Sequence, residues 1–95
     1  MDLLALRPLA EQLFDEVRAL SFDGVGVTRE SYGRGESATA EYLRDFARAQ
    51  GLEAEPDRAA NLVFRLPGTA PDAPVAWTGS HIDSVPQGGN FDGLA

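Results

Sequence analysis

The 95-residue sequence contains no cysteine and no lysine. Without cysteine the chain has no disulfide framework and no thiolate metal site, so any bound metal must use histidine, aspartate or glutamate. Apart from one histidine every basic residue is arginine, and 15 acidic residues against 8 arginines give a net charge of -7. Nucleic acids and anionic membrane surfaces require a basic footprint on a partner, so neither is predicted to bind this protein.

A long apolar run is also missing. The leucine-rich first twenty residues are interrupted by Asp2, Arg7, Glu11 and Asp15, so neither a signal-peptide core nor a membrane span is predicted. We therefore expect a cytoplasmic protein. A hydrophobic content of 43 % is ordinary for a globular chain, and the length suits one small domain.

Apolar periodicity predicts two helices. The first has an apolar stripe at spacings of three and four residues, with Pro8 in its first turn. The members of this stripe are Leu6, Leu9, Leu13, Val17 and Leu20. Its polar face is acidic, which favours core packing over membrane binding. The second helix is predicted over residues 37–50, with Ser37 as its N-cap and Gly51 as a left-handed C-terminal cap.

Three strands are predicted after the second helix. Residues 52–55 fit an edge strand closed by Pro56, and residues 61–66 are expected to pair with it as a hairpin. Residues 75–80 are apolar enough for a central, buried strand that ends at His81. In open α/β sheets ligands bind beyond the carboxyl ends of strands, so this topology places His81 at a ligand-binding edge.

The last stretch, GSHIDSVPQGGNFDGLA, contains the candidate chemistry. Zinc takes imidazole nitrogen and carboxylate oxygen as ligands, so His81 is a candidate ligand. Asp83 shares one face of an extended segment with His81 and can hold its ring through the second nitrogen. Asp92 lies too far along the chain to share that segment, so a turn at Gly88 and Gly89 must bring it back to His81. Glycine permits the positive φ and the close backbone approach that such a turn needs. A surface loop with a capped turn is the alternative explanation of these residues.

The longer string GSHIDSVPQGGNFDG resembles the first metal-binding segment of the dinuclear-metal amidohydrolases related to zinc aminoacylases. Its Gly-Gly-x-Phe-Asp-Gly ending is most similar to the branch of N-carbamoyl-L-amino-acid hydrolases and allantoate amidohydrolases. Upstream motifs follow in the order expected of that branch: Gly26-Val27-Thr28-Arg29, Tyr32-Gly33-Arg34-Gly35-Glu36, Gly51-Leu52-Glu53, Asn61-Leu62 and Arg65-Leu66-Pro67-Gly68. One departure is Ala60, where the family usually has glycine, so the geometry of that turn is open.

The resemblance implies an α/β fold. Residues 1–95 would be the N-terminal portion of a three-layer α/β/α catalytic domain like that of zinc exopeptidases, with two helices and then three strands. The family binds two divalent metal ions, for which zinc is expected first and manganese, cobalt or nickel also suit the ligands. His81 would bind one ion, Asp92 would bridge both, and Asp83 would serve catalysis by holding the His81 ring and tuning its basicity. Arg29 could contact substrate.

The implied reaction is hydrolysis of a non-peptide C–N bond in a small linear amide or ureido substrate, such as an N-carbamoyl-L-amino acid or allantoate, by metal-activated water. The family's general base, remaining ligands and lid domain come later in the chain. We therefore expect residues 1–95 to be an N-terminal fragment of a homodimeric enzyme, inactive and poorly folded alone. Two alternatives stay open: a metallo-aminopeptidase or N-acyl-amino-acid deacylase of the same fold, and a catalytically dead fragment or binding module.

Overall fold

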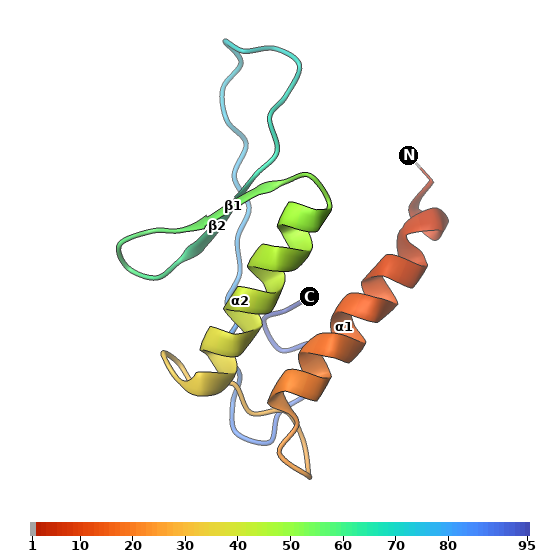
Figure 1. Ribbon diagram of the computed structural model, residues 1–95, viewed down its shortest axis with the longest axis vertical. Helices are drawn as coiled ribbons and strands as arrows, with labels where there is room; N and C mark the ends of the chain where they lie inside the picture. Colours follow the sequence, from red (N-terminus) through yellow and green to blue (C-terminus); the bar gives the residue numbers. More distant parts are fainter. Residues whose placement is uncertain (1) are drawn as a thin grey trace.

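A computed structural model describes residues 2–95 and shows a mixed α/β arrangement (Figure 1). A short 3-10 helix η1 (Leu3–Leu6) leads into helix α1 (Arg7–Ser21), followed by helix α2 (Arg34–Ala49) and strands β1 (Glu53–Pro56) and β2 (Leu62–Arg65). The two α-helices pack against each other, and the two strands pack on α2. The predicted helices and mixed α/β class are thus confirmed, whereas a three-layer arrangement is not seen in residues 2–95.

Helix α1 begins as its sequence predicts, with Pro8 in the first turn. Within the apolar stripe Val17 is fully buried, Leu9 and Leu13 are half-buried, and Leu6 and Leu20 are each 45 % exposed. A salt bridge between Arg7 and Glu11 lies on the solvent side at an i,i+4 spacing. No helix in residues 2–95 is both long and apolar enough to cross a membrane.

Helix α2 begins three residues before the predicted start. Gly33 occupies the N-cap position, and the Ser37 amide already donates to the Gly33 carbonyl, so Ser37 lies inside the first turn and the predicted Ser37 cap is wrong. The other end follows the prediction. Gly51 has φ +85°, and the Gly51 and Leu52 amides donate to the Arg48 and Ala47 carbonyls, which is the pattern of a Schellman cap.

Strands β1 and β2 form the predicted antiparallel hairpin, with Glu53 opposite Arg65 and Pro56 opposite Leu62. In the turn between them, the Asp57 carboxylate accepts hydrogen bonds from the backbone amides of Ala59 and Asn61. Ala60 takes φ +65°, the left-handed region that favours glycine. The one departure from the resembled family therefore falls at a position where glycine would be the less strained residue.

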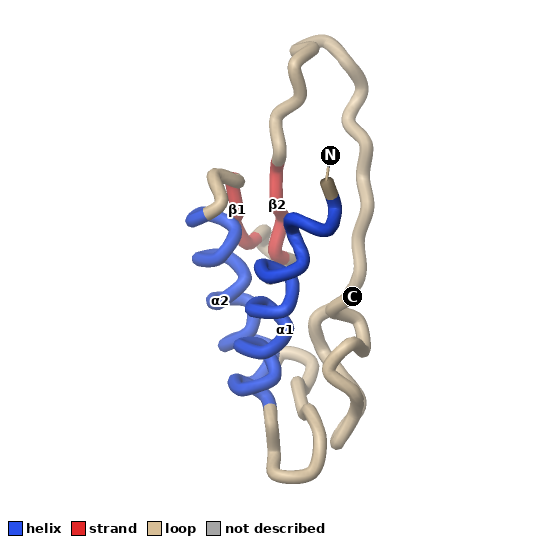
Figure 2. The backbone as a smooth tube through the Cα atoms, turned by 90° about the vertical axis from the view of Figure 1, so that its right-hand side faces the viewer, coloured by secondary structure: helices blue, strands red, loops and turns tan. Residues whose placement is uncertain are grey.

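The third predicted strand is not formed, and this prediction is wrong. Residues 66–80 run as an open loop that extends away from the helices and returns towards the C-terminal segment (Figure 2). Val75 is 73 % exposed and Trp77 is 76 % exposed, so the segment is neither central nor buried. An apolar segment becomes a strand only when a neighbour pairs with its backbone, and within residues 2–95 the sheet consists of β1 and β2 without residues 75–80.

Candidate metal centre

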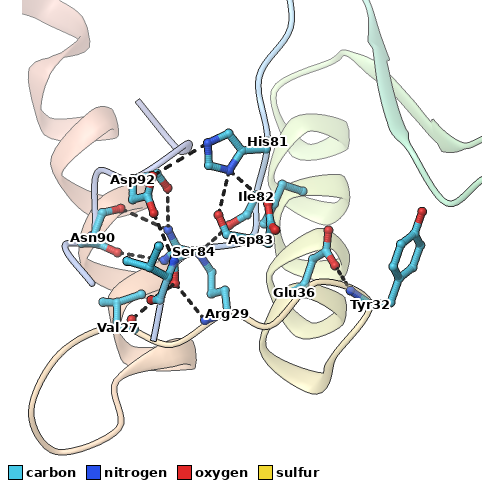
Figure 3. A network of polar contacts seen from close by, with 11 residues as sticks. Val27, Arg29, Tyr32, Glu36, His81, Ile82, Asp83, Ser84, Asn90 and Asp92 are labelled. Atoms are coloured by element: carbon cyan, nitrogen blue, oxygen red, sulfur yellow. Dashed lines mark hydrogen bonds and ion pairs between the residues drawn. The ribbon is translucent and has the colours of Figure 1, made fainter. Parts of the chain in front are cut away.

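The His81 ring is held by Asp83 through one of its two nitrogens. Nδ1 lies 2.8 Å from the Asp83 carbonyl oxygen and 3.0 Å from its carboxylate Oδ1 (Figure 3). Both partners are acceptors, so Nδ1 carries the proton in the neutral ring and Nε2 keeps its lone pair. Hydrogen bonding to the Asp83 carbonyl raises the pKa of His81; loss of solvation opposes this rise, and the Asp83 and Asp92 carboxylates add to it.

Asp92 approaches the opposite side of the same ring. Its Oδ2 accepts a hydrogen bond from the Val85 amide at 3.2 Å, and its Oδ1 lies 3.8 Å from His81 Nε2 (Figure 3). The side chain of His81 is 56 % exposed and that of Asp92 37 % exposed, so solvent reaches the space between them. One carboxylate oxygen is therefore anchored, and the other faces the free ring nitrogen.

The donor pair fits a divalent ion. Zinc bonds to imidazole nitrogen and carboxylate oxygen are about 2.0–2.2 Å long, so two donors to one ion are about 3.4 Å apart at the tetrahedral angle and at most about 4.3 Å apart. The 3.8 Å between His81 Nε2 and Asp92 Oδ1 is within this limit. Asp83 contacts the other ring nitrogen, which is the usual place of a carboxylate that orients a ligating histidine.

Only two of these three side chains converge on one point. Within residues 2–95 no group of three or more histidine, aspartate or glutamate side chains is arranged to hold a metal ion. The structure thus brings together all three residues that the sequence singled out, as two facing donors and one ring-holding carboxylate.

Backbone contacts between two distant loops bring Asp92 back to His81. Val27 and Gly88 exchange both of their backbone hydrogen bonds, at 2.9 and 2.8 Å. The predicted role of Gly88 is right in one respect, because a Cβ there would lie 2.9 Å from the Val85 side chain. The predicted positive φ is wrong, because the positive φ values in this segment occur at Gln87 and Gly93 and not at Gly88 or Gly89.

Gly93 is a site residue that the pattern analysis missed. It has φ +73°, and a Cβ at this position would lie 2.5 Å from His81 Nδ1 and 2.5 Å from Cε1. The backbone of Gly93 therefore packs directly against the imidazole. The signal for it is the Phe-Asp-Gly ending of the segment, whereas positive φ was predicted for the pair Gly88 and Gly89.

Arg29 does not occupy the predicted position. Its side chain is 0 % exposed and donates to backbone carbonyls of the segment that carries the site (Figure 3). The expected substrate contact is therefore wrong for this residue, because a fully enclosed guanidinium cannot meet a ligand in solution. A single sequence cannot show that an arginine in a polar loop will be enclosed by a segment more than fifty residues later.

The sequence places the chain in the family of the relatives that follow, which are named as N-carbamoyl-L-amino-acid and allantoate amidohydrolases. It is 40 % identical over 89 residues to the N-carbamoyl-L-amino-acid amidohydrolase of Paenarthrobacter aurescens, a match that covers 90 % of this chain and 22 % of that protein. It is 46 % identical over 68 residues to the Geobacillus stearothermophilus enzyme of the same name, covering 72 % of this chain and 17 % of that protein.

A second activity is represented among the relatives. The chain is 41 % identical over 68 residues to the allantoate amidohydrolase of Escherichia coli, covering 72 % of this chain and 16 % of that protein. The chain thus spans about a fifth of the length of the curated relatives that it matches. Neither a family model nor a solved structure gives a significant match.

Proposed function

We propose that this chain forms part of the active site of a metal-dependent amidohydrolase that cleaves a non-peptide C–N bond in a carbamoyl or ureido substrate. Two observations support the proposal. The relatives are named for N-carbamoyl-L-amino-acid and allantoate hydrolysis. In addition, the free nitrogen of His81 and one oxygen of Asp92 face each other at 3.8 Å, which carries the metal assignment.

Each of the three polar side chains has its own task in this proposal. His81 would hold one divalent ion, zinc first, through Nε2, and the Asp92 carboxylate would serve as the ligand shared with a second ion. Such ions, when bound, would supply Lewis-acid polarisation of a substrate carbonyl and acidification of water. Asp83 keeps the proton on Nδ1, so that Nε2 remains available, and it keeps the ring plane directed at Asp92.

The remaining ligands are proposed to come from outside residues 2–95. A zinc site has at least three protein ligands, and the described residues place two on the open side of the His81 ring. The general base and the pairing of whole chains as a homodimer stay predictions that rest on the resemblance, and the cytoplasmic location stays a prediction from the charged residues that interrupt the N-terminal leucines.

Metal titration of the full-length protein tests the assignment. His81→Ala should abolish binding of the ion that His81 holds, because the ring nitrogen is lost. Asp83→Asn should retain metal but weaken its affinity roughly 10- to 100-fold, the usual cost of removing a partner that orients a ligating histidine. Undiminished zinc affinity in His81→Ala would refute the metal site.

Substrate comparison tests the reaction class. We expect the zinc-loaded full-length protein to release ammonia from N-carbamoyl-L-amino acids or allantoate and to leave dipeptides and N-acyl-amino acids intact. Cleavage of dipeptides or N-acyl-amino acids without action on ureido compounds would point to the peptidase or deacylase activities instead. Absence of all these activities in a metal-loaded protein would indicate a catalytically dead relative.

A further inference from the structure

Arg29 has the largest fully buried side chain in residues 2–95, although it is charged. It lies in the loop between α1 and α2, far in sequence from the segment that carries His81 and Asp92. Burial lowers the pKa of the guanidinium, and the charges of Asp92 and Asp83 oppose this shift. Burying an unpaired charge strongly destabilises a fold, so the partners of Arg29 should account for its position.

Every N–H of the guanidinium has an acceptor. Nε donates to the Ile82 carbonyl at 2.7 Å. One terminal nitrogen donates to Ser21 Oγ at 3.2 Å and to Asn90 Oδ1 at 3.3 Å. The other donates to the backbone carbonyls of Asn90 at 3.3 Å and Asp92 at 3.1 Å. The five donors of a guanidinium fork are thus matched by five acceptors.

Four of these five acceptors lie on the two arms of the candidate metal centre, and the fifth, Ser21, ends helix α1. Ile82 is the residue between His81 and Asp83, and Asp92 supplies the facing carboxylate. The backbone of Arg29 strengthens the first contact, because its amide donates to Ser84 Oγ at 3.0 Å and its carbonyl accepts from the Ser84 amide at 2.8 Å. Besides the hydrogen bond from the Val85 amide to the Asp92 carboxylate, the Arg29 side chain thus links the two arms through their backbone carbonyls (Figure 3).

We propose that Arg29 is a positioning residue, whose guanidinium fixes the separation between His81 Nε2 and Asp92 Oδ1 so that both bind one ion. This inference rests on the proposed function of these two side chains as ligands. Arg29 itself touches neither the ion nor substrate. It acts through its hydrogen bonds to the backbone carbonyls of Ile82 and Asp92, one on each arm. Lysine cannot replace it, because a compact ammonium has three donors and cannot reach acceptors on both arms at once.

The test uses Arg29→Lys in the full-length protein, with zinc affinity measured by competition with a chromophoric chelator. We expect a loss of affinity of about 10- to 100-fold, the range found for groups that orient ligands. The absorption spectrum of the cobalt-loaded protein provides a second measurement that does not depend on activity. We expect its bands to shift in position or intensity, because they report the coordination geometry that Arg29 is proposed to set.

Two further variants separate positioning from general destabilisation. Ala54→Gly opens the core at a residue that is 1 % exposed in β1, outside the site, and should lower thermal stability while leaving zinc affinity and the cobalt spectrum unchanged. Asn90→Ala removes one acceptor of the guanidinium on the Asp92 arm. If Arg29→Lys does not fold, Asn90→Ala decides the question, with a weaker loss of affinity and an altered cobalt spectrum expected.

The outcomes are distinct for the two proposals. Failure of the unmodified full-length protein to bind zinc or cobalt would overturn the proposed function and this inference with it. If zinc binding is lost in His81→Ala but unchanged in Arg29→Lys, the metal site stands and the positioning role is refuted. The same holds for unchanged binding in Asn90→Ala, if that variant has to replace Arg29→Lys. An Ala54→Gly variant that loses as much affinity as Arg29→Lys would also refute it, because stability alone would then explain the effect.

Discussion

At the scale of single residues, the site depends on close contacts to its histidine. Asp83 takes the proton side of the His81 ring, Asp92 faces the other nitrogen, and Gly93 packs against the ring itself. Each contact limits how far the imidazole can rotate. A ligand that is already held in place loses less conformational freedom on binding, so in the proposed metal site this arrangement would favour affinity for the ion.

Gly93 offers a direct test of that restraint. Gly93→Ala should lower zinc affinity at least about tenfold, the range for a disturbed ligand orientation, because the new methyl would lie 2.5 Å from two atoms of the His81 ring and displace it. Gly89→Ala is the matched control: it lies in the same segment, has no positive φ, and its Cβ would meet nothing within 4 Å. Equal zinc affinities in the two variants, measured by chelator competition, would contradict the packing argument.

At the scale of elements, helix ends and turns follow local rules. The Schellman cap at Gly51 and the hairpin between β1 and β2 form as their residues predict. The start of α2 differs because Gly33 and Arg34 extend the helix by one turn, and the Glu36 carboxylate accepts a hydrogen bond from the Tyr32 amide ahead of it. An acidic side chain near a helix N-terminus is favourable, so Glu36 competes with Ser37 as the residue that defines the start.

The hairpin turn yields a stability prediction. Ala60→Gly should stabilise the protein by about 0.5–1 kcal/mol, because relief of the left-handed strain exceeds the extra entropy of glycine in the unfolded chain. Ala59→Gly changes the same residue type one position earlier, where φ is not positive, and should destabilise by about 0.4–1 kcal/mol. Urea unfolding midpoints measure both effects, and a lower midpoint for Ala60→Gly would show that the turn is not strained.

At the scale of the whole molecule, the core is small. The buried apolar side chains of residues 2–95 are Val17, Val27, Ala47 and Ala54. The radius of gyration is 14.5 Å, against about 12 Å for a compact domain of this length. Much apolar surface therefore stays in water, including Trp77 at 76 % exposure. This is the physical basis for expecting residues 1–95 alone to be only marginally stable.

Trp77 is the single tryptophan and reports directly on the loop of residues 66–80. In residues 1–95 expressed alone, we expect its emission maximum and its quenching by iodide to match those of free N-acetyltryptophanamide, because the indole is exposed. Phe64→Trp in a Trp77→Phe background is the comparison, since Phe64 is 45 % exposed and should be quenched less. A blue-shifted, protected Trp77 would show that residues 75–80 pack as the strand that their composition suggests.

The sequence by itself determined the two helices, the hairpin and the three polar side chains of the candidate site. These features depend on short-range effects: apolar periodicity, the left-handed preference of Gly51, and the two-residue spacing of His81 and Asp83 in an extended segment. Such effects act between residues a few positions apart, and a pattern of side chains records them directly.

Only the tertiary structure decided the burial of Arg29, the return of Asp92 to His81, and the exposure of residues 75–80. Each is a long-range outcome. Arg29 is enclosed because carbonyls of Ile82 and Asp92 satisfy its donors, and Asp92 returns because Gly88 pairs with Val27. Residues 75–80 remain an open loop because no strand pairs with them within the described chain. Whether a buried charge finds its acceptors, or an apolar segment finds a neighbour, depends on partners that distance along the chain does not reveal.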